Sequence, residues 1–397
     1  FNFIDRQLLV ILQEPLKAEL GLTDTQLGLL TGLAFAALYV VLGIPVARLA
    51  DTSNRKNIIA ISLAFWSVLT TLSGTVKNFS QLFLARIGVG IGEAGCSPPA
   101  HALISDYFPP DKRATALSIY STGIYLGILL GYTIGGMIAQ KYGWRYAFYA
   151  LGIPGILVAI LLYFTVREPI KGRLDTESSG TAPLGLKEVI QALLRKKTFV
   201  FLALAAGFQA FGNYGIGNFL PSFLQRIHGI DIATAGVVLG LSTGLGGGLG
   251  TFLGGYLADH QKHKDERWYI WVPMLAGAVA FLPNAILFFS NNSQLVMITA
   301  FFTSALSAFY LGPIIAVSHN LVSAKMWAFT SAILFFVLNF IGLVFGPLVI
   351  GMVSDALQPQ YGDLSLRWAF TTVFLTGSIS LFFLYLGSKN YLKDLKS

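Results

Sequence analysis

The sequence predicts an all-α membrane protein with twelve transmembrane helices in two pseudo-symmetric six-helix bundles. Of its 397 residues, 54% are hydrophobic and only 12% are charged, which is more apolar surface than a soluble core of this size can bury. The apolar residues also fall in runs of about 20, the length that a helix needs to cross a bilayer. Finally, the two halves of the chain share a series of motifs.

Eleven apolar runs are long enough to cross a membrane as helices. They cover residues 26–47, 57–76, 81–104, 114–139, 144–166, 198–223, 233–257, 268–290, 293–318, 328–353 and 368–388. A twelfth run, residues 1–12, is too short to cross and ends before Pro15. Because it does not begin with Met, we expect the first helix to start upstream of this sequence.

The longest polar segment divides the chain into halves. We expect an N-terminal six-helix bundle over residues 1–167, a cytoplasmic linker over 168–197 and a C-terminal bundle over 198–397. Within the linker, apolar residues recur at helical spacing beside basic ones, which is typical of an amphipathic helix lying on the membrane surface. The apolar positions are Leu186, Val189, Ile190, Leu193 and Leu194, and the basic ones are Lys187, Arg195, Lys196 and Lys197.

Three motifs of the first half recur in the same order in the second. Gly127, Gly131, Gly136 and Met137 are matched 215 residues later by Gly342, Gly346, Gly351 and Met352. The sequence RYAF at residues 145–148 returns as RWAF at 367–370, and RLAD at 48–51 returns as YLAD at 256–259. Two related bundles on either side of a midplane site are typical of transporters that work by rocking.

The basic residues predict the orientation in the membrane. If the chain starts inside, 19 Lys and Arg residues fall on cytoplasmic segments and six fall outside. We therefore expect a multi-pass protein of the cell inner membrane with both termini in the cytoplasm. The net charge of +8 does not indicate nucleic-acid binding, because the basic residues are scattered between apolar runs.

The stretch GVGIGEAG, residues 88–95, matches the glycine pattern of a dinucleotide-binding loop. That loop follows a strand, whereas these glycines lie inside an apolar run. On a helix, Arg86, Gly90 and Glu93 share one face, and Gly88, Gly92 and Gly95 share the opposite face. The bare glycine face is expected to let a neighbouring helix approach closely.

Four ionisable residues lie inside the predicted spans: Asp5 and Arg6 in the first, Arg86 and Glu93 in the fourth. Charged groups at this depth are costly unless they face water, a partner or a cavity. Asp5 and Arg6 point about 100° apart on a helix, so they are not expected to be each other's main partner. We expect all four to line or back one cavity. The alternative is a buried structural network that locks the first span to the fourth.

Several segments of the sequence resemble a known family. The segments FNFIDRQLLVILQEP, GIPVARLADTSNRK, RIGVGIGEAGCSPPA, YFPPDKRATALSIY and GWRYAFYALGIPG are similar to the spinster family of the major facilitator superfamily. The likeness continues through NYGIGNFLPSFL, FYLGP and FGPLVIGMVSD. It implies alternating access and, as in eukaryotic spinster members, transport of sphingosine-1-phosphate or lysophospholipids.

The resemblance also implies roles for the buried charges, with Asp5 and Glu93 in proton coupling and Arg6 and Arg86 in the response to substrate. Further polar residues in or beside spans are candidates for contacting a head group: Tyr125, Asn213, Tyr214 and Asn218. Phe208, Phe211 and Phe219 are candidates for contacting its acyl chain. The substrate is thus expected to be an amphiphilic small molecule that binds among membrane lipids together with protons.

The loop after the second span resembles the superfamily signature, with departures at Ala47, Thr52 and Asn54. It keeps Asp51 and Arg55 and is expected to form a cytoplasmic gate together with Arg113 and Asp259. In this gate Asp51 would cap the N-terminus of the eleventh span, and Asp259 would cap the fifth near Arg113. Trp327 stands where the repeat has Arg113, so one of the two latches lacks its basic partner.

The sequence predicts no cofactor, no metal site and no enzymatic activity, because no nucleophile, base and metal set occurs at one depth. His260 and His263 lie in a charged loop without a third ligand. We expect a monomer. The main alternative is a facilitator for a small organic anion or drug, in which Arg6 and Arg86 would bind a carboxylate or phosphate. A lipid scramblase would need no ionisable groups tied to a proton gradient. Substrate identity, direction and proton stoichiometry stay open.

Overall fold

The structure is a computed structural model that describes residues 1–170, 186–323 and 326–396. Within helices, it does not describe the side chains of residues 37, 40, 44, 47, 48, 51, 110, 111, 114, 186, 187 and 328. All regular elements in the described ranges are helical, which confirms the predicted all-α class. The chain forms two compact units, Phe1–Gly180 with Ile230–Gly240, and Thr181–Gly229 with Leu241–Ser397.

Among the described residues, nine stretches are long and apolar enough to cross a membrane. One of them, Phe329–Lys396, is 68 residues long and covers the last two predicted spans. The fourth predicted span is divided into two helices, Phe79–Ala94 and Ser97–Tyr107, and the first run forms a helix of 10 residues, Asn2–Ile11. The apolar runs therefore predict where the membrane helices lie. The number of stretches that qualify as spans differs from the number of runs, because some runs are divided into shorter helices and two runs fall in one stretch.

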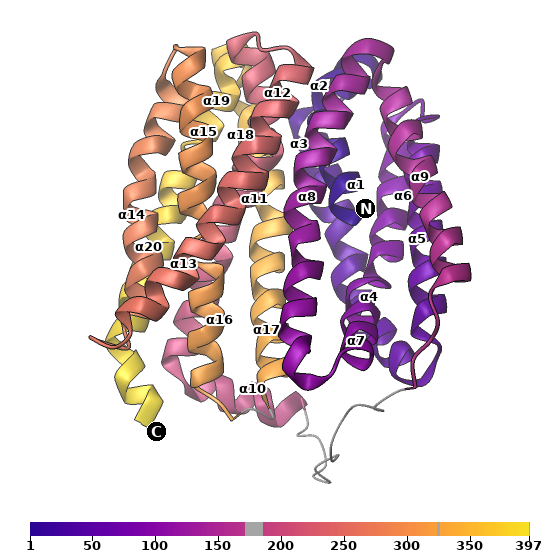
Figure 1. Cartoon of the computed structure of the whole chain (residues 1–397). Helices are drawn as coiled ribbons and strands as arrows, with labels where there is room; N and C mark the ends of the chain where they lie inside the picture. The colour runs from indigo at the N-terminus through magenta and orange to yellow at the C-terminus, as the bar shows by residue number, and fades with distance from the viewer. Residues whose placement is uncertain (171–185, 324–325, 397) are drawn as a thin grey trace. The chain divides into compact units, whose positions relative to one another are not determined.

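The first unit contains the helices that carry the buried charges (Figure 1). They are α1 (Asn2–Ile11), α2 (Gln13–Leu20), α3 (Asp24–Thr31), α4 (Leu33–Thr52), α5 (Arg55–Ser73), α6 (Phe79–Ala94), α7 (Ser97–Tyr107), α8 (Pro110–Tyr142), α9 (Trp144–Thr165) and α12 (Ile232–Leu239). The fourth span breaks between α6 and α7 because Pro98 and Pro99 have no backbone N–H to continue the helical hydrogen bonds.

Glycines fix the distances between these helices. A Cβ atom at Gly131 of α8 would lie 2.9 Å from the Ile4 carbonyl oxygen, and one at Gly127 would lie 2.8 Å from Phe3 Cβ, so α1 packs directly on α8. A Cβ at Gly92 would lie 2.8 Å from Trp66 Cβ on α5. Gly88 and Gly95 also face α5, which confirms the predicted close approach at the bare face of the fourth span. On the other face, Gly90 abuts the Phe35 backbone of α4.

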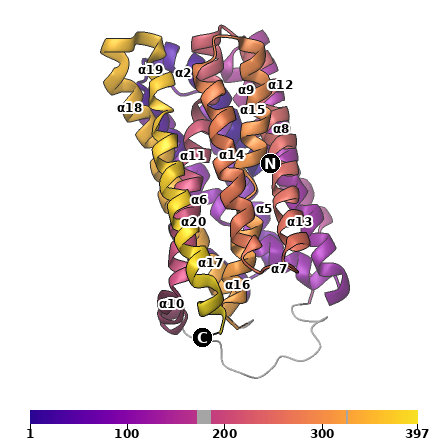
Figure 2. The same cartoon turned by 90° about the vertical axis from the view of Figure 1, so that its left-hand side faces the viewer.

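The second unit is built in the same way (Figure 2). Its helices are α10 (Leu186–Arg195), α11 (Lys197–His228), α13 (Gly247–Gln261), α14 (Trp268–Phe289), α15 (Ser293–Ser307), α16 (Leu311–Asn320), α17 (Trp327–Leu338), α18 (Phe345–Tyr361), α19 (Ser365–Ala369) and α20 (Thr372–Lys396), with π-helical segments Gly240–Gly246 and Asn339–Val344. Gly342 and Gly346, the repeats of Gly127 and Gly131, approach Ala210 and Phe211 of α11. The repeated glycines thus seat the first helix of each half.

The arginine of the repeated RYAF and RWAF motifs also makes the same kind of contact twice. Arg145 donates to the Val76 carbonyl oxygen over 3.3 Å, in the connection between α5 and α6. Arg367 donates to Asn291 Oδ1 over 3.1 Å, in the connection between α14 and α15. In each half this arginine ties the start of the last span to the loop between the third and fourth spans.

The predicted amphipathic helix of the linker is α10. Val189 and Leu193 are fully buried against the core of the second unit, whereas Leu194 is 65% exposed. Lys196 donates to the Asp394 carbonyl oxygen over 2.7 Å, and Asp394 Oδ2 accepts from the backbone N–H of Thr198 over 2.7 Å. One apolar stripe of the helix therefore packs against the second unit, while Ile190 and Leu194 are exposed. Residues 171–185 of the linker lie outside the described residues.

Candidate functional site

The most buried charged contact of the first unit joins α1 to α6. Arg6 Nε donates to Glu93 Oε2 over 2.8 Å, and a second guanidinium nitrogen lies 2.7 Å from the same oxygen. The Glu93 side chain is completely buried and that of Arg6 is 16% exposed. Arg6 thus has its main partner on another helix and not in Asp5, as the helical geometry predicts.

Asp5 and Arg86 complete this group of buried charges. Both are almost fully inaccessible, and each lies close enough to the other and to Glu93 to interact electrostatically. Neither oxygen of Asp5, nor Nε of Arg86, has a hydrogen-bond partner among the residues that the structure describes. The structure therefore brings all four predicted ionisable residues together, from α1 and α6, with two acidic and two basic groups.

Aromatic rings surround the guanidinium group of Arg6. Its Cζ lies 5.0 Å from the ring centre of Phe3, 4.3 Å from Phe35 and 4.8 Å from Tyr39. Cations are attracted to aromatic faces at such distances. Phe35, which is fully buried and stacks on Tyr39, also lies 5.5 Å from Cζ of Arg86. We call Phe3, Phe35 and Tyr39 the aromatic cage. This cage is not predicted from the sequence, although Phe35 and Tyr39 are spaced one helical turn apart.

The remaining residues predicted to contact a head group are divided between the units. Tyr125 lies on α8 of the first unit and is partly buried. Asn213, Tyr214 and Asn218 lie on α11 of the second. Asn213 donates to the Ser307 carbonyl oxygen over 3.1 Å, and Asn218 donates to the Tyr214 carbonyl oxygen over 2.7 Å. The amide of Asn213 is thus already engaged with α15, and that of Asn218 within its own helix.

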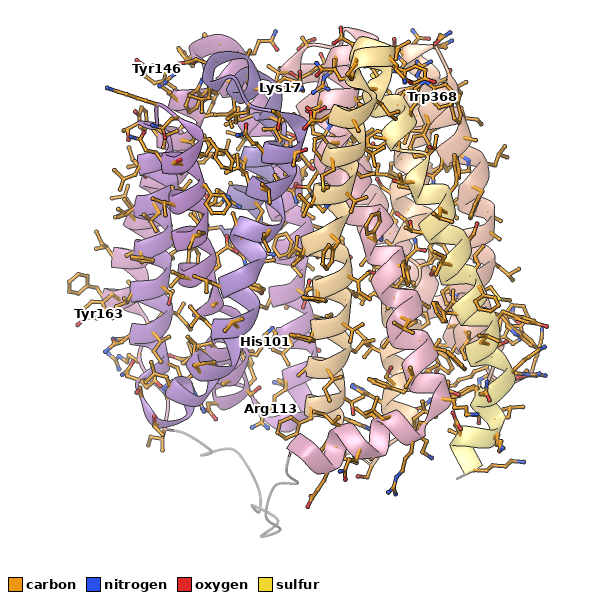
Figure 3. All side chains as sticks on the ribbon, turned by 180° about the vertical axis from the view of Figure 1, so that it is seen from behind. Lys17, His101, Arg113, Tyr146, Tyr163 and Trp368 are labelled. Atoms are coloured by element: carbon orange, nitrogen blue, oxygen red, sulfur yellow. The ribbon has the colours of Figure 1, made fainter. Side chains whose placement is uncertain are left out.

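Three of the predicted gate residues, Arg55, Arg113 and Asp259, make contacts within their own units. Arg113 lies at the end of the first unit opposite Lys17 (Figure 3) and donates to the Phe108 carbonyl oxygen over 3.0 Å. Arg55 forms an ion pair with Asp106 of α7. Asp259 accepts a hydrogen bond from Tyr269 over 2.5 Å. Asp51 lies in α4, but its side chain is outside the described part of the structure. The proposed caps between halves therefore stay predictions.

Two acidic residues at this end were not anticipated. Besides Asp106, Glu168 accepts from the backbone N–H of Arg55 over 3.0 Å and of Lys56 over 2.8 Å, so its carboxylate caps the start of α5. The sequence signal was weak because Glu168 lies 113 residues from Arg55 and outside any apolar run. Through these contacts Arg55 connects the start of α5 to Asp106 of α7 and to Glu168.

His319, whose role the sequence leaves open, has both a hydrogen-bonding partner and a stacking partner for its ring. Its Nε2 is 2.7 Å from Ser331 Oγ, and the ring stacks on Trp327 with centres 5.1 Å apart. Trp327 in turn donates to the His319 carbonyl oxygen over 3.1 Å. Within the described residues there is no group of three His, Cys, Asp or Glu side chains that could hold a metal ion.

Comparison with known proteins gives a consistent set of relatives. Residues 1–284 match the model of the Major Facilitator Superfamily. A crystal structure of a bacterial homologue of the human lysosomal transporter Spinster, inward-facing and unoccupied, superposes with a TM-score of 0.91 at 31% identity and covers 99% of this chain and 95% of its own. An MFS-type efflux pump of Mycolicibacterium smegmatis is 33% identical over 99% of this chain and 91% of its own length. A cis,cis-muconate transport protein of Acinetobacter baylyi is 28% identical over 75% and 71%.

Proposed function

The chain belongs to the Major Facilitator Superfamily as a spinster-type member, and we propose that it moves an amphiphilic lipid across the membrane by proton-coupled alternating access. It is a multi-pass membrane transporter and not an enzyme. The lipid would be a lysophospholipid or a sphingoid phosphate. We place it in the cell inner membrane as a monomer, with both termini in the cytoplasm.

One observation carries this proposal: the buried pair of Arg6 and Glu93, with Asp5 and Arg86 beside it. Removing charged groups from water costs several kcal/mol per ion, roughly, unless they are paired. A membrane protein that keeps four such groups in one place has a functional use for them more often than a structural one. Two carboxylates and two guanidinium groups are suited to binding a proton together with an anionic ligand.

The geometry supports the following sequence of events. When Glu93 is ionised, it holds Arg6, and the guanidinium is not free for a phosphate. A proton bound by Glu93 removes the negative charge, so Arg6 can turn its exposed edge toward an anionic head group while the aromatic cage holds the rest of the guanidinium. Arg86, behind Phe35, adds a second positive charge at the same place. Proton binding and head-group binding would then favour each other.

The test is transport in proteoliposomes. Labelled lysophospholipid and labelled sphingoid phosphate are offered with and without an imposed pH gradient, to the intact protein and to Glu93→Gln. Uptake that depends on the gradient and is lost in Glu93→Gln supports the proposal. If neither lipid moves in protein shown to be folded, the lipid substrate is wrong. If a lipid moves equally fast with and without the gradient in both proteins, proton coupling is wrong and a scramblase is favoured.

A second candidate is a transporter of a small organic anion or drug. It is favoured by the relatives named as a muconate transport protein and an efflux pump, and by the presence of two guanidinium groups around one aromatic ring. Arg6 and Arg86 would bind a carboxylate without needing any place for an acyl chain. Competition distinguishes the two candidates: a short-chain organic dianion should block uptake under this alternative, whereas only long-chain amphiphiles should block it under the main proposal.

A further inference from the structure

The polar atoms around Asp5 form a buried group that direct hydrogen bonds leave unsatisfied. In the described part of the chain, both oxygens of Asp5, Nε1 of Trp66, Oγ1 of Thr70, Nε of Arg86 and Oε1 of Glu93 are buried and have no hydrogen-bond partner. A buried polar atom without a partner is destabilising, and most such atoms in proteins are paired with protein or ordered water. Six of them in one region need a common explanation.

These residues come from three helices, of which α5 and α6 pack on each other. Asp5 lies on α1, Trp66 and Thr70 lie on α5, and Arg86 and Glu93 lie on α6. Trp66 lies beside Asp5 without the geometry of a direct hydrogen bond, and Asp5 interacts with both Glu93 and Arg86. Thr70 follows Trp66 by one turn and therefore lies on the same face of α5. Gly92 lets α6 approach α5 at the level of Trp66.

Glu93 uses only one of its two oxygens for Arg6. Both contacts with Arg6 use Oε2, so Oε1 is left buried and without a partner. The set as a whole offers donors from Trp66, Thr70 and Arg86 and acceptors from Asp5 and Glu93. A buried water molecule makes about three hydrogen bonds to such groups, and it occupies polar sites rather than apolar ones.

We infer that Asp5, Trp66, Thr70, Arg86 and Glu93 enclose a hydrated chamber, and that its water passes a proton between the carboxyl groups of Asp5 and Glu93. The O–H bond of one carboxylic acid breaks as its proton joins a water molecule, and that water gives one of its own protons to the other carboxylate. No charge or atom is gained or lost in the exchange. Trp66 and Thr70 are positioning residues that hold the water. The proton exchange rests on the proposed function, whereas the water does not.

The first experiment detects the water directly. Hydroxyl radicals made by an X-ray pulse oxidise side chains next to bound water, and mass spectrometry measures the rate at each residue. Trp66 is 1% exposed and Phe223 is fully buried. After correction for the intrinsic reactivity of each residue type, Trp66 should be oxidised about tenfold faster than Phe223. Thr70→Val should slow the oxidation of Trp66, and Thr70→Ser should restore it. Equal protection of Trp66 and Phe223 would overturn the chamber.

The second experiment tests the proton exchange. Trp66→Phe keeps an aromatic ring but removes the N–H donor, so the turnover of gradient-driven transport should fall about tenfold with KM unchanged. Equilibrium exchange of substrate, which moves no net proton, should continue at the wild-type rate. Unchanged gradient-driven turnover in Trp66→Phe would overturn the proton route even if the water is present. If the wild-type protein ignores the gradient, the proposed function fails and the proton route with it, while the radical labelling still decides on the water.

Discussion

Arg6 Nε donates to Glu93 Oε2 over 2.8 Å, and this hydrogen bond connects two helices whose residues are 87 positions apart in the chain. The same contact serves two different hypotheses. As a structural lock, it would hold α1 against α6 and act on stability alone. As a coupling device, it would open when Glu93 takes up a proton, and it would act on transport. The substitution that separates them keeps the shape of the side chain and removes only its charge.

Glu93→Gln should abolish the dependence of transport on a pH gradient while leaving a folded protein. Glutamine can still accept a hydrogen bond from Arg6, but it cannot bind or release a proton. Because the substitution leaves Arg6 without its counter-charge, some loss of stability is also expected, within the roughly 3–5 kcal/mol measured for broken buried pairs. Transport with and without the gradient and thermal unfolding in detergent should be measured on the same preparation. Lower stability with intact gradient dependence would favour the structural lock.

Phe35→Leu should weaken substrate binding more than Tyr39→Phe. The Phe35 ring lies 4.3 Å from Cζ of Arg6 and 5.5 Å from Cζ of Arg86, so its loss removes an attraction to both cations. Each such interaction is worth about 0.5–2 kcal/mol, which corresponds to a rise in apparent KM of about 2- to 30-fold. Tyr39→Phe keeps the ring and should stay near the wild-type KM. Concentration dependence of uptake measures both, and equal KM values in all three proteins would contradict a role for the aromatic cage.

Most of the fold could be predicted because each membrane helix corresponds to a run of apolar residues in the sequence. The positions of the buried charges were also predictable, since Asp5, Arg6, Arg86 and Glu93 are costly at their depth and stand out in such runs. The pairing of Arg6 with Glu93 and not with Asp5 follows in part from the 100° between neighbouring side chains on a helix.

The partners of the charges could not be predicted, because they come from helices whose packing no local pattern encodes. Phe35 lies 4.3 Å from Cζ of Arg6 on α1, and its backbone is also where Gly90 lets α6 lie against α4. Trp66 is one aromatic residue among many in an apolar run, and nothing in its neighbourhood marks it as the one beside Asp5. Likewise Glu168 caps the start of α5 although it lies 113 residues from Arg55 in the chain. Helix breaks are an intermediate case, since Pro98 and Pro99 indicate one.

Gly131→Ala should destabilise the protein, whereas Gly123→Ala on the same helix should not. A Cβ at position 131 would lie 2.9 Å from the Ile4 carbonyl oxygen and 3.0 Å from Gln7 Cβ, so α1 must shift away from α8. Overpacking of this kind costs about 1–3 kcal/mol. Position 123 has open space within 4 Å, and alanine favours a helix over glycine. Thermal unfolding of the two variants compares them directly.

Transport gives the Gly131 prediction a second measurement. Because Asp5 and Arg6 follow Ile4 on α1, a shift of that helix should also lower gradient-driven uptake in Gly131→Ala. Gly346 is the repeat of Gly131 in the second half, and a Cβ there would lie 2.6 Å from the Phe211 carbonyl oxygen. Gly346→Ala should therefore destabilise the protein to a similar degree. If Gly131→Ala and Gly123→Ala unfold at the same temperature, the close packing of α1 on α8 is not needed for stability.

Glu19 should stabilise the protein in a pH-dependent way. It lies outside the apolar runs, and its carboxylate accepts a hydrogen bond from Trp144 Nε1 over 2.6 Å and forms an ion pair with Arg145. The hydrogen bond from Trp144, followed by that from Arg145, lowers the pKa of Glu19 below its ordinary value of 4.5. A group with a lowered pKa in the folded state stabilises it above the ordinary pKa, and this stabilisation is lost as the pH falls through the folded pKa.

The comparison of wild type with Glu19→Gln across pH tests this sign. At neutral pH the variant should unfold at a lower temperature, and the difference should shrink as the pH falls below about 4.5. The effect should be small, because the Glu19 side chain is 49% exposed and solvent screens its ion pair. In a Trp144→Phe background, which removes the N–H donor, the effect of Glu19→Gln at neutral pH should be smaller. A difference that grows on acidification would mean that Glu19 binds its proton more tightly in the folded protein, opposite to what its contacts with Trp144 and Arg145 require.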